Sequence, residues 1–171
     1  TPVVDGTVSA SAITYGQALS ESTITGKMKD PDTGAEVTGT FAWTDDTVKP
    51  SADNGDRNTT ADWVFTPDAP EYVTATGTIR VVVNKAQFTN VSVEQDGTLT
   101  YNGEAQTASV KTAFTAADNG NTIRFGYSAG PLKVGLGYYS AVPAFTEAGE
   151  HTVYYVVYDT EQNHENYKGQ F

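Results

Sequence analysis

The chain has 171 residues, a formal net charge of -11, only 10 Lys and Arg residues and no cysteine. Nucleic acids and anionic membranes are excluded as expected partners because binding them needs clustered basic side chains. The lack of cysteine excludes disulfides, thiolate metal sites and Cys nucleophiles, and no apolar run is long enough to span a bilayer.

The first half of the chain predicts short strands separated by turns. Alternating apolar residues predict strands around Ile13, over 24–28 and over 41–43. The run Asp30-Pro31-Asp32-Thr33-Gly34 predicts a turn, because Pro presets φ and Gly accepts a positive φ. Two further strands are predicted by the inward-facing residues Ala61, Trp63, Phe65, and then Gly77, Ile79, Val81 and Val83.

The pattern restarts after residue 85. The run Leu99-Thr100-Tyr101-Asn102-Gly103 echoes Ile13-Thr14-Tyr15-Gly16, and the strand predicted over 151–158 echoes the one over 61–65. We therefore predict two domains, 1–85 and 86–171, each near the size of about 100 residues that is typical of immunoglobulin sandwiches. The second domain stops where its closing strand should start. We expect that strand to be short or missing, and the chain to be part of a longer protein.

The stretch from Ala148 to Asp159 predicts a turn followed by a central strand. Alternation places His151, Val153, Tyr155 and Val157 on one face of this strand. The spacing follows the Gly-x-Tyr-x-Cys pattern that begins strand F of immunoglobulin sandwiches, with His151 in the tyrosine-corner position. Trp43 matches the buried Trp of strand C. The sequence therefore predicts an all-β chain of two tandem immunoglobulin-like β-sandwich domains, with about seven strands each.

Turn and core motifs in both halves resemble the tandem immunoglobulin-like repeat modules of large bacterial cell-surface and secreted proteins, whether adhesin-like or carbohydrate-active. The motifs are Tyr15-Gly16-Gln17-Ala18-Leu19, Gly39-Thr40-Phe41-Ala42-Trp43, Trp63-Val64-Phe65-Thr66-Pro67, Val81-Val82-Val83-Asn84-Lys85, Tyr101-Asn102-Gly103, Val142-Pro143-Ala144-Phe145 and Asn166-Tyr167. The resemblance implies an extracellular location at a bacterial cell wall or cell surface, with neighbouring modules of the same polypeptide as partners. It supplies no catalytic residues.

The most suggestive candidate binding residues are tyrosines in the second half. Tyr154 and Tyr158 are predicted to face outward on the central strand, with Gly126 outward on the strand beside it and Tyr138 and Tyr139 nearby in sequence. A bare glycine between tyrosines can form a groove for a sugar ring or a peptide. The alternative, which we prefer, is that the tyrosines cover the gap left by Gly126 and stabilise the sheet.

A candidate calcium loop lies in the first half. Asn54, Asp56 and Asn58 place oxygen-bearing side chains at the spacing that opens such a loop. The Gly and Glu that complete an EF-type loop are replaced by Thr59 and Phe65, so we prefer a polar turn and expect no cofactor.

Catalytic chemistry has little support in the sequence. His151 and His164 are the only histidines, and we expect His151 to be a corner residue that bonds to the backbone rather than a metal ligand. Asp45-Asp46 could suggest a glycosidase pair, but adjacent strand residues point to opposite faces, so solvated loop acids are the better interpretation. We therefore expect that this chain is not an enzyme.

Two functions from different classes remain. The first is a non-catalytic structural or spacer module pair that presents neighbouring functional modules. The alternative is an adhesin-like module that binds a polysaccharide or host glycoprotein, which depends on the outward tyrosines. In either case we expect a monomer that binds no nucleic acid and does not insert into a membrane.

Overall fold

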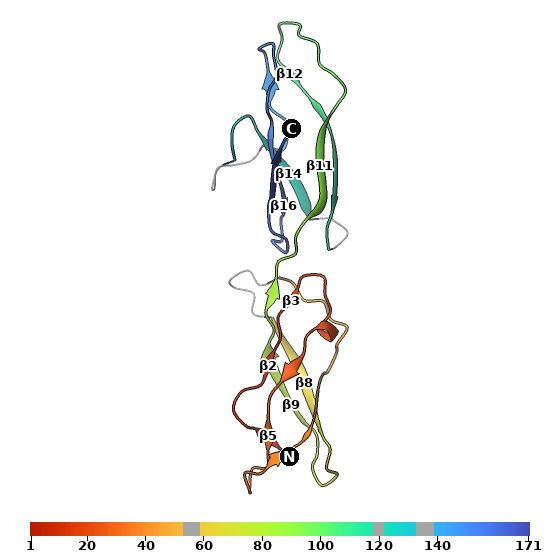
Figure 1. The fold of residues 1–171 in the computed structure, drawn as a ribbon, viewed down its shortest axis with the longest axis vertical. Helices are drawn as coiled ribbons and strands as arrows, with labels where there is room; N and C mark the ends of the chain where they lie inside the picture. The colour runs from red at the N-terminus through yellow and green to blue at the C-terminus, as the bar shows by residue number, and fades with distance from the viewer. Residues whose placement is uncertain (53–58, 118–121, 133–138) are drawn as a thin grey trace. The chain divides into compact units, whose positions relative to one another are not determined.

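The structure is a computed structural model that describes residues 1–52, 59–117, 122–132 and 139–171 (Figure 1). Within these residues the fold is all-β without α-helices, and no helix is long and apolar enough to cross a membrane. The chain divides into two compact units, Thr1–Lys85 and Ala86–Phe171, which we call unit 1 and unit 2. The described strands form several small sheets, and nearly all of their pairings are antiparallel.

In its described residues, unit 1 contains mostly short strands and one 3-10 helix. Its elements are β1 (Val3–Val4), β2 (Ser9–Ala10), β3 (Ile13–Thr14), η1 (Leu19–Glu21), β4 (Ile24–Thr25), β5 (Met28–Lys29), β6 (Glu36–Val37), β7 (Gly39–Trp43), β8 (Thr60–Pro67), β9 (Ala75–Arg80) and β10 (Val83–Asn84). The longest strands form the sheet β7-β8-β9, and smaller sheets are β1-β5-β6, β2-β4 and β3-β10. The pairing of β3 with β10 is parallel.

The core of unit 1 is built by the alternation that the sequence predicted. Trp63 and Phe65 on β8 are buried beside Met28, Val37 and Ala75. A second cluster is formed by Ile13, Leu19, Trp43, Val81 and Val83. Trp43 can be buried at low cost because its Nε1 donates a hydrogen bond to the Ser22 carbonyl at 2.8 Å.

The predicted turn over 30–34 is confirmed. The Asp30 carboxylate accepts hydrogen bonds from the backbone N–H groups of Asp32 and Thr33 at 2.9 and 2.8 Å, and Gly34 has a φ of 73°. These two hydrogen bonds stabilise the turn without any contact to buried apolar side chains.

The described residues of unit 2 form fewer strands than those of unit 1, and the strands are on average longer. Its elements are β11 (Thr89–Asp96), β12 (Gln106–Thr107), β13 (Ser109–Thr115), β14 (Ile123–Ser128), β15 (Ala144–Phe145), β16 (Tyr154–Asp159) and β17 (Tyr167–Gln170). They form the sheets β11-β13, β12-β15 and β14-β16-β17. The position predicted for the closing strand is occupied by β17, which has four residues and pairs with β16.

The central strand of unit 2 buries the predicted face. Val153, Tyr155 and Val157 are 3%, 5% and 0% exposed and belong to one core with Phe88, Val93 and Ile123. The strand itself begins at Tyr154, not at His151. His151 lies before it, in a turn, where its Nε2 is 2.8 Å from the Glu147 carbonyl oxygen. The predicted corner bond to the backbone is therefore confirmed.

Candidate functional site

The face of β16 opposite the core carries the predicted tyrosines. Tyr154 pairs with Ser128, Val156 with Gly126 and Tyr158 with Arg124, so the two tyrosines flank the Val156–Gly126 pair along the strand. Val156 is fully buried, Gly126 is buried and the tyrosines are half-buried. This burial favours the interpretation in which neighbouring side chains cover the glycine.

The structure does not place the other predicted site residues together on this face of β16. Tyr139 is 71% exposed and its backbone forms an isolated bridge with Tyr127. Tyr138 and the candidate calcium ligands Asn54, Asp56 and Asn58 lie outside the described residues. Within the part of the chain that the structure describes, no group of three or more His, Asp or Glu side chains is arranged to hold a metal ion.

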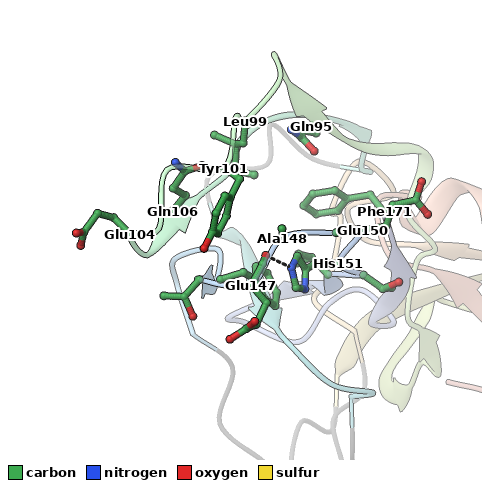
Figure 2. A pocket seen from close by; sticks show the side chains of 16 residues that line it. Gln95, Leu99, Tyr101, Glu104, Gln106, Glu147, Ala148, Glu150, His151 and Phe171 are labelled. Carbon is green, nitrogen blue, oxygen red and sulfur yellow. Dashed lines mark hydrogen bonds between the residues drawn. The ribbon is translucent and has the colours of Figure 1, made fainter.

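The structure contains a pocket in unit 2 that the sequence did not indicate. It has a volume of about 490 Å³ and lies between the segment around residues 99–108 and the turn that precedes β16. Figure 2 shows Tyr101 and Phe171 among the side chains around it, with His151 and Glu147 joined by their hydrogen bond. One wall is an aromatic pair, because the Phe145 and His151 rings stack at 4.3 Å.

The pocket offers both apolar contact and hydrogen-bond acceptors. Tyr101 and Leu99 at its rim are 65% and 51% exposed, so their apolar surfaces are open to contact with a ligand. Its described lining includes Glu104, Glu147 and Glu150 but neither Lys nor Arg. The pocket is therefore electronegative, and it disfavours acidic ligands while accepting hydroxyl and amine donors.

A buried polar cluster lies in the connection between β16 and β17. The His164 ring and the Asp159 carboxylate are both 0% exposed, and His164 Nδ1 is 2.9 Å from Asp159 Oδ2. The backbone N–H groups of Glu161 and Asn163 also donate to this carboxylate, at 2.9 and 3.0 Å. Burial alone would raise the pKa of Asp159, but these hydrogen bonds outweigh it and lower the pKa of the carboxyl below its usual value.

The cluster is arranged for structure and not for proton transfer. The Ala117 backbone N–H donates to His164 Nε2 at 3.1 Å, so Nε2 is an acceptor and Nδ1 is the nitrogen that donates to Asp159. Both nitrogens are engaged inside the protein, and the ring stacks on Phe88 at 4.8 Å. His164 therefore joins three segments of unit 2 and presents no free base to a substrate.

The same cluster fixes the start of unit 2. The backbone N–H of Ala86 donates to the Asn163 carbonyl at 3.0 Å, and the Ala86 carbonyl accepts from the Glu165 N–H at 2.9 Å. The first residue of unit 2 is thus held in a parallel bridge beside the buried histidine.

Sequence reasoning missed the pocket and the Asp159–His164 pair. The pocket had one local signal, since Leu99 and Tyr101 are large apolar residues beside an Asn-Gly turn. For the buried pair, the signal was weak: a lone Asp at the end of an apolar strand and a His five residues later.

Comparisons with known proteins give no identification. No protein-family model, no curated protein and no solved structure matches this chain.

Proposed function

We propose that this chain is a pair of immunoglobulin-like β-sandwich modules that acts as a non-catalytic spacer in an extracellular bacterial surface protein and presents the modules beside it. The all-β fold, the internal repeat and the separate core of each unit support this proposal. So do the three-stranded sheets β7-β8-β9 and β14-β16-β17, in which β8 and β16 are the middle strands.

The observation that carries the proposal is the short junction. Asn84 is the last residue of β10, and its carbonyl accepts a hydrogen bond from Tyr15 within unit 1 at 2.8 Å. Ala86 is already bonded to the connection between β16 and β17 within unit 2. Only Lys85 lies between these two anchored residues, whereas a flexible tether would need several Gly or Ser residues.

The spacer proposal predicts a narrow distribution of distances between labels in the two units. Because the chain has no cysteine, spin labels can be attached specifically at two exposed positions, through Asp32→Cys and Ser109→Cys. The distances between the labels are then measured by pulsed electron paramagnetic resonance. The control inserts about ten Gly and Ser residues after Lys85, which should broaden the distribution. Equal widths in the two proteins would contradict the spacer proposal.

A second candidate function is the binding of a neutral polysaccharide, and the pocket of unit 2 favours it. The Tyr101 side chain and the Phe145–His151 pair provide aromatic surface for the apolar face of a sugar ring, and the glutamates provide acceptors for its hydroxyl groups. The position differs from the predicted one, because it lies at the turn before β16 and not on the outer face of that strand.

For this second function, Tyr101→Ala is expected to weaken retention on a binding polysaccharide by about two- to tenfold, because a lost aromatic contact is worth about 0.5–1.5 kcal/mol. The assay uses insoluble starch, cellulose, mucin and bacterial cell-wall material. Tyr139→Ala is the matched control, since Tyr139 is similarly exposed outside the pocket. Tyr154→Ala and Tyr158→Ala test the outer face of β16. Retention that survives Tyr101→Ala, or no retention at all, would rule out the pocket as a polysaccharide site.

A further inference from the structure

The segment between β11 and β12 carries an exposed asparagine, Asn102, followed by Gly103. Residues 101–105 are all exposed, and none of them belongs to a strand. Glycine has no Cβ, so nothing blocks the approach of its backbone nitrogen to the side chain of the asparagine before it. Among the asparagines that the structure describes, Asn102 is the one that precedes a glycine.

The hydrogen bonds of this segment hold the side-chain oxygen of Asn102 and leave two nitrogens free. Asn102 Oδ1 accepts a hydrogen bond from the Glu104 backbone N–H at 2.9 Å. In the described part of the chain, neither Asn102 Nδ2 nor the Gly103 N–H has a hydrogen-bond partner. Gly103 has a φ of 77°, which glycine adopts without strain. The arrangement therefore leaves both a nucleophile and a leaving group accessible beside one carboxamide.

This arrangement is suited to deamidation, which needs only the two residues and water. The Gly103 backbone nitrogen forms a bond to Asn102 Cγ, and its proton passes through solvent to Nδ2. The Cγ–Nδ2 bond breaks, ammonia leaves, and a cyclic imide remains. Water then opens the imide at either carbonyl, which gives aspartate or isoaspartate. Negative charge develops on Oδ1 during the attack, so the Glu104 N–H that already donates to Oδ1 stabilises the transition state.

The turn of unit 1 that the sequence repeat pairs with this one forms without such an asparagine. There Tyr15 is followed directly by Gly16, which has a φ of 94°. That turn is closed by the Thr14 N–H, which donates to the Gln17 side-chain oxygen at 2.7 Å. The turn can therefore be built without an Asn-Gly pair, and the reactive pair is a property of unit 2.

We propose that Asn102 is a modification site at which the folded chain deamidates spontaneously, assisted by the Glu104 backbone N–H. The site lies at the rim of the unit 2 pocket, since Tyr101 and Glu104 on either side of the pair both line it (Figure 2). Deamidation places a new carboxylate at this rim, and the isoaspartate product also adds a methylene group to the backbone. The pocket thus becomes more negative with time, whichever of the proposed functions holds.

The test is a time course of the full chain at physiological temperature and mildly alkaline pH. Peptide mapping by mass spectrometry measures the exchange of a side-chain NH₂ for OH at each asparagine separately. Deamidation at Asn102 is expected to be roughly tenfold faster than at Asn90 and Asn166, which are also exposed but precede residues with a Cβ. Hydroxylamine attacks the cyclic imide and should cleave the chain after residue 102.

Three variants separate the chemistry from the shape of the turn. Asn102→Ser keeps a side-chain oxygen for the turn but has no carboxamide, so both signals should vanish at this position. Glu104→Pro removes the donor to Oδ1 and should slow deamidation at Asn102 at least about twofold. Ala105→Pro is the matched control with an expected wild-type rate, because the Ala105 N–H has no hydrogen-bond partner within the described residues.

Deamidation at Asn102 that is no faster than at Asn90 and Asn166, or the lack of hydroxylamine cleavage after residue 102, would overturn the modification site. Equal rates in Glu104→Pro and Ala105→Pro would overturn the assisting role of the Glu104 N–H. Neither result affects the spacer proposal, which is decided separately by the distance distributions.

Discussion

Asp159→Ala is expected to lower the free energy of unfolding of unit 2 by about 3–5 kcal/mol. The substitution removes the acceptor of three hydrogen bonds. Those from His164 Nδ1 and the Asn163 backbone N–H are buried, and the one from the Glu161 backbone N–H is part-buried. Each buried donor left without an acceptor costs about 1–3 kcal/mol, and the three costs are not fully additive. The loss should therefore exceed that of an ordinary surface substitution several-fold.

The chain offers a built-in way to assign this loss to one unit. Its two tryptophans, Trp43 and Trp63, both lie in unit 1, so tryptophan fluorescence follows the unfolding of unit 1 only. In urea, Asp159→Ala should leave the fluorescence midpoint unchanged and lower the midpoint of the tyrosine circular dichroism signal. A loss below about 1 kcal/mol would contradict the role given to this carboxylate.

The same carboxylate gives unit 2 a defined sensitivity to acid. Its pKa in the folded protein is lower than the ordinary value of 3.8 that applies to the unfolded chain. Its contribution to stability is therefore complete above the unfolded pKa and disappears as the pH falls through the folded pKa. Asp159→Asn should reduce the fall of the unit 2 unfolding midpoint that acid causes below about pH 5.

Trp63→Ala is expected to destabilise unit 1 by about 3–5 kcal/mol, the usual cost of removing a buried aromatic side chain. Trp63 is 4% exposed, its ring centroid lies 5.2 Å from that of Phe41, and it faces Gly77 across the pair of β8 and β9. A Cβ at Gly77 would lie 2.5 Å from the Trp63 ring, so the indole fills the space that the glycine leaves.

This contact predicts a strong coupling between the two positions. Gly77→Ala alone should cost about 1–3 kcal/mol through overpacking, but it should be neutral or stabilising when Trp63→Ala is already present. The remaining Trp43 reports unfolding in every variant. Gly130→Ala in unit 2, read by the tyrosine circular dichroism signal, is the control for a general glycine effect, since a Cβ there meets nothing within 4 Å. Additive effects of Gly77→Ala and Trp63→Ala would show that the ring does not cover the glycine.

Local patterns in the sequence were enough to predict the cores and several turns. The alternation over Trp63 and Phe65, and again over Val153, Tyr155 and Val157, depends only on neighbouring residues and the period of a strand. The Asp30–Gly34 turn and the His151 corner follow equally from short spacings.

Features that join distant segments were not predictable in the same way. The parallel register of Ile13 with Val83 depends on where the whole of unit 1 places its ends, and no local pattern carries that information. The pocket needs the segment around Tyr101 to meet the turn around Glu147. In the sequence His164 is an isolated histidine, whereas in the structure it contacts Asp159 on β16 and, from more distant parts of the chain, Ala117 and Phe88.

The parallel pairing of β3 with β10 also has a consequence for folding. Ile13 lies near the beginning of unit 1 and its partner Val83 near the end, so this contact has one of the largest sequence separations that the unit allows. Contacts of this kind require a large loop to close first and slow the folding of a domain. Unit 1 cannot complete its structure until residues 83 and 84 are available, so a fragment that stops a few residues earlier should leave the edge of β3 open to aggregation.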